Sequence, residues 1–351
     1  MIWILPMVVL VVQLMRWLNS RPVMASCEPP QLDARQTRSV TFLVAAWNAA
    51  EDVEPFVKAF RALNLPSAQL VLAAGGEDGT YERAVSLSDA QVTVILQRAG
   101  EGKQRALANA FPYARGTIIY LTDIDCRPTR DVVNPMLLHL DTAPQEVAAG
   151  MVRPLESQVT NRFVLAQWAV YQASRMAESS SVTGIDGRNA AVRRDILVAT
   201  RALEVPAPSG TDYTLAKELL RRGFVIRRVC SEMPTEFPPT FGTYVKKQAR
   251  WLRNVWLLGG RYRALREVRQ VALTVTFPLA VVALMLVGVW LHQALALALA
   301  LVLWSLGNRT IYLKKAGVAP YLWANAMLLG GDWSASLLML IQIWRGSLAW
   351  S

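Results

Sequence analysis

Apolar residues are unevenly distributed along the chain. Residues 1–18 are almost wholly apolar, residues 39–240 have the mixed composition of a globular domain, and long apolar runs return after residue 270. Residues 271–291 and 293–313 are each long enough to cross a bilayer, which takes about 20 apolar residues. The pattern predicts a membrane protein that carries one large domain outside the membrane.

Within the mixed region, short apolar strands alternate with amphipathic helices. We expect strands at residues 40–46, 69–73, 92–97 and 116–122, with helices between them that include residues 51–63 and 103–114. Strand–helix units in this order predict an α/β fold with a mostly parallel, doubly wound sheet of the Rossmann-like type. Further on, we expect helices at residues 131–140, 162–178 and 213–222, strands at 147–153 and 224–229, and a glycine-rich basic loop at 184–194.

Residues 244–258 have the clearest helical period in the chain. At about 100° per residue, aromatic and aliphatic side chains fall on one side of this helix and basic side chains on the other. The apolar side holds Tyr244, Val245, Trp251, Leu252, Val255 and Trp256, and the basic side holds Lys246, Lys247, Arg250 and Arg253. This composition is typical of a helix in the headgroup layer of a membrane. An ordinary amphipathic helix packed on a soluble core is the alternative.

The last apolar stretch, residues 320–344, is interrupted by Gly330, Gly331 and Asp332. We expect either one kinked span or a re-entrant pair of short helices. Asp332 is a candidate functional residue if it lies at membrane depth, because a charged side chain is costly there. Exposure at the interface is the alternative.

Basic residues set the expected orientation. Arg16 and Arg21 follow the first apolar run, and Lys314 and Lys315 follow the third. By the positive-inside rule, the amino terminus lies outside and the large domain lies on the cytoplasmic side of the inner cell membrane. The expected organisation is an anchor at 1–20, a linker at 21–38, a cytoplasmic catalytic domain at 39–240, basic interface helices at 241–269, and a region with about three spans at 270–351.

Net charge and cysteine content indicate which partners and which compartment to expect for this protein. The formal charge of +11 is concentrated between Lys246 and Arg269, beside the apolar C-terminal third. That position indicates contact with anionic lipid and argues against nucleic acid as a partner. Cys27, Cys126 and Cys230 have no metal-binding spacing, and they fit a reducing compartment without disulfides.

The segment at residues 116–125 is a buried strand that ends in two carboxylates, Asp123 and Asp125. Residues i and i+2 of an extended chain point the same way, and open α/β sheets bind ligands beyond the carboxyl ends of their strands. Two carboxylates of this kind suit Mg²⁺ or Mn²⁺ together with a bound phosphate. For an isolated pair, two solvated acids in a surface turn are the alternative.

Six segments in sequence order resemble the membrane-integrated family 2 glycosyltransferases, which include the ceramide glucosyltransferases and the hyaluronan, chitin and cellulose synthases. The segments are residues 40–48, 75–80, 102–109 and 122–125, then Asp212 in a Gly-Thr-Asp-Tyr sequence, and the Arg250-Trp251 pair. The resemblance covers roughly residues 39–256 and implies a GT-A fold. The layout of the chain is most similar to that of the ceramide glucosyltransferase group.

The resemblance also implies roles for individual residues. Asp125 would bind Mn²⁺ or Mg²⁺, Asp123 would contact the metal or the ribose, and Asp212 would be the general base that inverts the anomeric configuration. The nucleotide-sugar side would comprise Ala46, Asn48, Asp78, Lys103, Asp123 and Arg250, and the acceptor side Gly184, Arg188, Gln248 and Trp251. We therefore expect transfer of a sugar, with glucose the first candidate, from a UDP-sugar to the hydroxyl of a membrane lipid.

Two departures from the family pattern bear on donor and acceptor. Ala73 and Ala74 stand where the family often has an Asp pair, so recognition of the base must differ in detail. Lys247 stands at the Gln position of the Gln-x-x-Arg-Trp motif, and Gln248 follows it. This substitution argues against processive polymer synthesis, as does a count of about four spans. Polysaccharide synthesis, a polyprenyl-phosphate acceptor and a non-catalytic membrane scaffold are the alternatives, the last disfavoured by the intact Asp residues.

Overall fold

The computed structural model describes residues 3–21, 39–176, 181–207, 209–319 and 321–346. These residues form two compact units, which are described separately. The sheet unit contains the described parts of residues 26–156 and 178–236. The helix unit contains those of residues 1–25, 157–177 and 237–347. The predicted linker lies outside the described residues except for Arg21.

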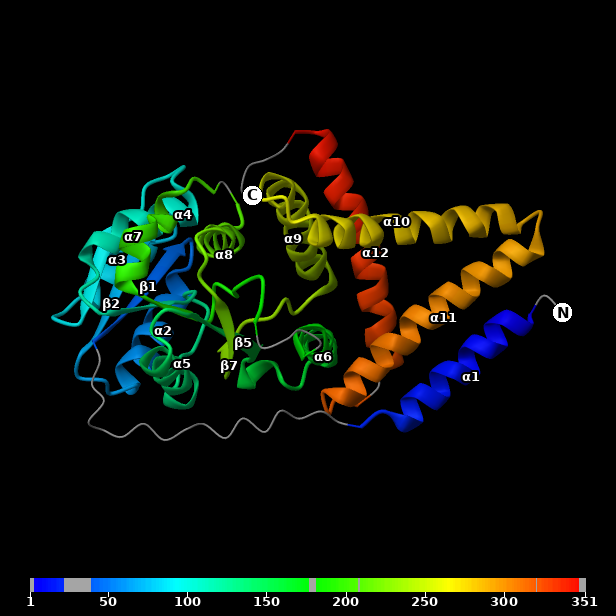
Figure 1. Ribbon diagram of the computed structural model, residues 1–351, viewed down its shortest axis with the longest axis horizontal. Coiled ribbons are helices and arrows are strands. Elements are labelled where there is room, and N and C mark those ends of the chain that lie inside the picture. Colours follow the sequence, from blue (N-terminus) through cyan, green and yellow to red (C-terminus); the bar gives the residue numbers. More distant parts are fainter. Residues whose placement is uncertain (1–2, 22–38, 177–180, 208, 320, 347–351) are drawn as a thin grey trace. The chain divides into compact units, whose positions relative to one another are not determined.

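The sheet unit is built on seven strands in the order β3-β2-β1-β4-β6-β5-β7 (Figure 1). Their bounds are β1 Val40–Trp47, β2 Ala68–Gly75, β3 Val92–Leu96, β4 Ile118–Leu121, β5 Val147–Pro154, β6 Ala190–Arg193 and β7 Ile226–Thr235. Only β6 runs antiparallel to its neighbours, β4 and β5. The prediction of a mostly parallel α/β sheet is confirmed.

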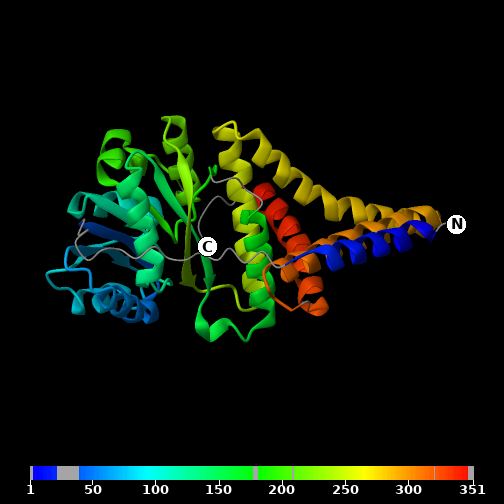
Figure 2. The same ribbon diagram turned by 60° about the horizontal axis from the view of Figure 1, so that its bottom comes forward.

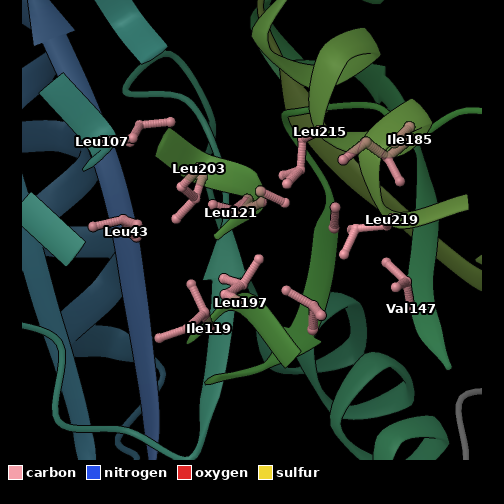
Figure 3. Packing of buried hydrophobic residues seen from close by; sticks show 14 of the residues in the cluster. Leu43, Leu107, Ile119, Leu121, Val147, Ile185, Leu197, Leu203, Leu215 and Leu219 are labelled. Atoms are coloured by element: carbon pink, nitrogen blue, oxygen red, sulfur yellow. The ribbon is translucent and has the colours of Figure 1, made fainter. Parts of the chain in front are cut away.

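Helices cover both faces of this sheet. They are α2 (Ala50–Ala62), α3 (Thr80–Ser86), α4 (Gly102–Ala110), α5 (Arg130–Thr142), α7 (Arg194–Thr200) and α8 (Thr211–Arg221). Alternate strand residues pack in opposite directions: Leu43 and Ile119 meet the leucines of α4, α7 and α8, as Figure 3 shows. On the other face, Phe42 stacks on Tyr120 with ring centroids 4.9 Å apart and meets Phe60 of α2 edge-on.

The expected strands and helices of the sheet unit are present with shifts of a few residues at their ends. Two elements, β6 and α7, were not predicted, because residues 184–194 were expected to form a loop. Four residues of strand and seven of helix are too short to produce a recognisable period. Strand β6 forms because Ala190 and Ala191 pair with β4 and β5, and these contacts cannot be recognised in the local sequence.

The helix unit consists of α1 (Ile4–Asn19), α6 (Arg162–Met176), α9 (Phe241–Arg261), α10 (Leu265–Gly288), α11 (His292–Lys315) and α12 (Leu322–Trp344) among the described residues. By length and composition, α10, α11 and α12 could each cross a membrane, whereas the apolar α1 has 16 residues. Figures 1 and 2 show α1 beside α11, where the Gln13 amide donates to the Trp304 carbonyl at 3.1 Å.

The last apolar stretch forms one continuous helix, α12. Of the two predicted alternatives, this agrees with a single span and not with a re-entrant pair of short helices. Glycine lowers helix propensity by about 1 kcal/mol, and tertiary packing overrides that cost here. The side chain of Tyr244 on α9 lies against Gly331, so the glycine serves close packing of two helices.

The cysteines differ from expectation in one respect. Cys126 is buried and free, as predicted. Cys230 is disulfide-bonded, so the prediction that the cysteines form no disulfide is wrong for that residue. Cys27 lies outside the described residues.

Four neighbouring strands meet at one buried polar side chain, Asn189, which directly precedes β6 and is fully shielded from solvent. Its Oδ1 accepts a hydrogen bond from the Tyr120 hydroxyl of β4 at 2.5 Å. Its Nδ2 donates to the Met151 carbonyl of β5 at 2.8 Å and to the Ser231 hydroxyl of β7 at 3.1 Å. Because a buried polar group is costly without partners, this network fixes the loop that leads into β6.

Replacement of Asn189 by Ala should destabilise the protein by about 1–3 kcal/mol, because the Tyr120 hydroxyl would be left buried without its acceptor. The apparent melting temperature in detergent would fall accordingly. Val198→Ala on α7, where the side chain is 51% exposed, is the matched control and should change stability by no more than about 0.5 kcal/mol. Equal melting temperatures for Asn189→Ala and the native protein would contradict this role.

Candidate active site

Three functional candidates follow strands that end at the same edge of the sheet. Strands β1, β2 and β4 are parallel, with Trp47 paired to Gly75 and Leu43 paired to Leu121. The loops after β1 and β2 therefore begin side by side, and the loop after β4 begins beside the last residues of β1 at the same edge. These loops carry Asn48, Asp78 and Asp123. Ala46 is buried within β1, so the structure does not bring it to the surface of this edge.

Asn48 and Asp78 hold the first two loops together. The Asn48 carbonyl Oδ1 accepts from the Glu77 backbone N–H at 2.8 Å, and Asn48 itself adopts a left-handed backbone with φ of 51°. The Asp78 carboxylate accepts from the Ala50 N–H at 3.0 Å and from the Thr80 hydroxyl at 2.5 Å. Desolvation acts to raise the pKa of Asp78, but these hydrogen bonds prevail and lower it.

Lys103 and Asp123 form the central ion pair of the site. Lys103 is the second residue of α4, and its Nζ contacts Asp123 Oδ1, with both side chains partly buried. Burial alone would lower the pKa of Lys103. The carboxylates of Asp123, Asp212 and Asp125 outweigh burial and raise that pKa, so the ammonium stays charged.

Asp212 lies in the first turn of α8, whose Leu215 and Leu219 pack into the core below it (Figure 3). Desolvation is the largest influence on its carboxyl group and raises the pKa. Lys103 lowers the pKa, Asp186 raises it, and the hydrogen bond from the Tyr213 N–H at 2.9 Å lowers it. The net direction is upward, which is the direction that a general base near neutral pH requires.

Gly187 allows Lys103 and Asp212 to share one corner of the site. A Cβ built on Gly187 would lie 3.1 Å from Asp212 Cβ and 3.6 Å from Lys103 Nζ. The first distance is tighter than ordinary van der Waals contact, so a larger residue would displace the base. Gly184, at the start of the same loop, has open space around its Cα.

Arg188 is paired within its own loop. Its guanidinium donates from Nε and Nη2 to the two oxygens of Asp186, each at 2.8 Å. The positive potential expected from this loop is therefore largely offset by Asp186, a residue that sequence reasoning did not select. The sequence signal for this bidentate ion pair was an aspartate and an arginine, Asp186 and Arg188, on either side of one glycine.

Cys126 contacts both the loop after β4 and the loop before β6. Its thiol lies 3.7 Å from Asp125 Oδ1 and 3.9 Å from the Arg188 carbonyl. Burial, followed by the charges of Asp125 and Asp123, raises the pKa of this thiol, so it stays protonated and serves as a donor.

The carboxylates of Asp123 and Asp125 are the candidate ligands for a divalent cation that is shared with a diphosphate. Among the described residues, no group of three or more Asp, Glu, His or Cys side chains is arranged to hold a metal by itself. Mg²⁺-type ions, however, bind commonly through one or two carboxylates plus substrate phosphates and water. Because Lys103 neutralises Asp123, Asp125 is the stronger candidate ligand of the two.

Gln248, Arg250 and Trp251 belong to α9 in the helix unit. The buried arc of α9 consists of Tyr244, Ala249, Leu252, Arg253, Val255 and Gly259. Trp251 is 52% exposed and Trp256 is 39% exposed. Arg253 of the predicted basic side is buried within the protein, whereas Trp251 and Trp256 of the predicted apolar side are exposed. Exposed tryptophans beside basic residues are typical of a helix that lies in the headgroup layer of a membrane.

Comparison with known proteins identifies part of the chain. Residues 41–199, a little under half of the chain, match the family model for Glycosyl transferase family 2. No curated protein matches the sequence.

Solved structures resemble the fold at low sequence identity. One is a mannosyltransferase, PcManGT from Pyrobaculum calidifontis in complex with GDP-Man and Mn²⁺, which is 16% identical with a TM-score of 0.55; the match covers 99% of this chain and 100% of that one. Another is glucosyl-3-phosphoglycerate synthase from Mycobacterium tuberculosis in complex with phosphoglyceric acid, at 16% identity and a TM-score of 0.43, covering 62% of this chain and 79% of that one. Residues 41–199 therefore resemble glycosyl transferase family 2 in sequence, and the chain has a GT-A-like fold.

Proposed function

We propose that this protein is an inverting glycosyltransferase that moves a sugar from a nucleoside-diphosphate sugar to the hydroxyl of a membrane lipid. UDP-glucose is the first candidate donor, and the cytoplasmic face of the membrane is the proposed side. The observation that carries the proposal is the Asp212 carboxyl group, whose pKa is raised beside an ammonium that is paired with Asp123. A base and a cationic site for phosphate are the two groups that the reaction requires.

The transfer is a single displacement. The acceptor oxygen forms a bond to the anomeric carbon while the bond from that carbon to the diphosphate oxygen breaks, and the bonding pair leaves with the diphosphate. The acceptor proton passes to Asp212, and the ammonium of Lys103 stabilises the negative charge that develops. A divalent ion held by Asp125 and Asp123, when bound, would neutralise the same diphosphate.

A lipid acceptor is supported by the helix unit. Three helices there have the length and composition to cross a bilayer, and α9 carries exposed tryptophans next to basic residues. A bilayer lipid presents its hydroxyl at the surface, where no channel is needed. A polymer synthase has to pass its product through the membrane, and the few apolar helices favour a lipid product over that alternative.

The base of the donor nucleotide can be identified by comparing UDP-sugars with GDP-sugars. Ala73 and Ala74 are buried in β2 and offer no side-chain hydrogen bonds to a base. The similar mannosyltransferase was solved in complex with GDP-Man. GDP-sugars therefore belong beside UDP-sugars in any donor screen of this protein.

Purified protein in detergent, given radiolabelled nucleotide sugars, Mn²⁺ and membrane lipid extract, should yield an organic-soluble labelled product. Asp212→Asn should lower that rate by about 10²- to 10⁴-fold, the usual contribution of a general base. A high-mass aqueous polymer would overturn the lipid acceptor, and full activity of Asp212→Asn would overturn the assignment of the base. No consumption of any donor would favour a scaffold.

The pH dependence of transfer should follow Asp212, which must be deprotonated to act. The rate falls as the pH drops through the pKa of Asp212. Because the charge of Asp186 raises that pKa, Asp186→Asn should move the acid limb of the normalised profile to lower pH. Asp195→Asn, a surface carboxylate that is 62% exposed and paired with Arg193, is the charge-matched control and should leave the limb in place. A shift of the Asp186→Asn limb to higher pH would contradict the assignment.

Metal binding can be measured without enzymatic turnover. In calorimetric titration of Mn²⁺ in the presence of UDP, Asp125→Asn should weaken Mn²⁺ binding by about tenfold or more, since even residues behind a ligand commonly cost that much. Asp123→Asn should weaken it less, because Lys103 already neutralises Asp123. An equal or larger loss in Asp123→Asn would reverse the order of the two ligands.

A further inference from the structure

The two candidate metal ligands lie in a tight turn that directly follows β4. The Cys126 backbone N–H donates to the Asp123 carbonyl at 3.1 Å, so residues 123–126 form a β-turn with Ile124 and Asp125 at its centre. Among the described residues, Asp125 is not one of those with a positive φ, which excludes the type II form of this turn. The two forms differ by a rotation of the central peptide, whose carbonyl belongs to Ile124.

The Arg127 side chain folds back onto this turn. Its Nη1 donates to the Ile124 carbonyl at 3.1 Å and to the Cys126 carbonyl at 2.9 Å. Ile124 is only 7% exposed and Cys126 is fully buried, so these hydrogen bonds lie in a shielded part of the loop. A rotated central peptide would turn the Ile124 carbonyl away from Arg127. The guanidinium therefore stabilises the observed form of the turn, and with it the backbone on either side of Asp125.

The other nitrogen of the guanidinium is anchored to α2. Arg127 Nη2 donates to Asp52 Oδ1 at 2.8 Å, and the two side chains are 25% and 31% exposed. Asp52 lies in the first turn of α2, where the Ala50 N–H donates to Asp78 of the loop after β2. The Arg127 backbone is held separately, because its N–H donates to the Pro234 carbonyl of β7 at 2.8 Å. Arginine is suited to this position, since its planar fork of donors reaches several acceptors at once.

These contacts indicate a role for Arg127 in metal binding, although a guanidinium has no lone pair to offer a cation. We propose that Arg127 is a positioning residue, which holds the turn after β4 so that the Asp125 carboxylate faces the divalent cation and the diphosphate. Asp52 anchors the guanidinium, and α2 thereby links the metal loop to the loop that carries Asp78. This inference rests on the proposed function, and within it on Asp125 as a metal ligand.

The charge of Arg127 makes the sign of its effect informative. A guanidinium near a divalent cation repels it, so electrostatics alone would make metal binding tighter when the guanidinium is removed. Loss of a group that orients a metal ligand has the opposite effect and commonly weakens binding by about 10- to 100-fold. The direction of the change in a variant without the guanidinium therefore distinguishes positioning from a simple effect of charge.

Arg130 provides a matched control in the same segment of the chain. It is the first residue of α5, and its guanidinium also donates to backbone carbonyls next to α2. Its Nε donates to the Leu63 carbonyl at 2.6 Å and its Nη2 to the Asn64 carbonyl at 2.9 Å. These acceptors follow the last residue of α2 and lie outside the turn that carries Asp125. Arg130→Met thus removes the same charge and similar hydrogen bonds without a direct effect on the turn.

The experiment is calorimetric titration of Mn²⁺ into the full-length protein in detergent, in the presence of UDP. Arg127→Met should weaken Mn²⁺ binding by about tenfold. Arg127→Lys keeps the charge and should also weaken Mn²⁺ binding, because an ammonium group lacks the rigid fork of donors. UDP binding measured without metal should be unchanged in both variants. Arg130→Met should leave Mn²⁺ binding at the native affinity.

The outcomes separate the positioning role from the metal site on which it rests. If the native protein binds Mn²⁺ and Arg127→Met binds it equally well or more tightly, the positioning role is wrong and the metal site stands. A native affinity in Arg127→Lys would also contradict the role, since charge alone would then suffice. An equal loss in Arg130→Met would show a general effect of destabilisation. If the native protein binds no Mn²⁺ in the presence of UDP, the proposed metal site fails first and the role of Arg127 fails with it.

Discussion

Several carboxylates lie close together in the candidate active site, and one ammonium offsets most of their repulsion. Asp123, Asp125 and Asp212 all act on Lys103 to raise its pKa, while Asp186 is held by Arg188. Two like charges about 4 Å apart repel by about 4 kcal/mol at the effective dielectric of a protein surface. Burial raises the pKa of Asp212, and the one lysine that these acids share lowers it only in part, so the pKa stays raised. The base and the phosphate-binding cation are thus consequences of the same electrostatic balance.

The remainder of the sheet unit keeps these charges in place. Leu121 and Leu215 anchor in the core the segments that carry Asp123 and Asp212. Gly187 permits the approach of Lys103 to Asp212, and Asn189 fixes the other end of the same loop through hydrogen bonds to β4, β5 and β7. In the helix unit, one ion pair, formed by Asp332 and Arg309, lies between α9, α11 and α12. Both units thus contain a partly buried ion pair.

Much of the fold and the identity of the candidate residues could be predicted from sequence, because strand period, helix period and motif order are local signals. Asp123, Lys103 and Asp212 were expected from the family resemblance, and the structure places them around one corner. The pairing of Arg188 with Asp186 was missed because a charge balance depends on which side chains meet. The choice between one span and a re-entrant pair at residues 320–344 could not be made for a similar reason, since the contact of Gly331 with Tyr244 joins residues far apart in sequence. The burial of Arg253 on the predicted basic side of α9 likewise depends on tertiary contacts.

The most direct test of the charge balance is infrared titration of the protein without ligands, comparing the native chain with Asp212→Asn. The native spectrum should contain one protonated-carboxyl band that persists above the ordinary aspartate pKa of about 3.9 and is missing from Asp212→Asn. In Lys103→Met that band should persist to still higher pH, because Lys103 lowers the pKa of Asp212. An Asp212 band that disappears together with the other aspartates, or one that moves to lower pH in Lys103→Met, would contradict the proposed base and its electrostatic origin.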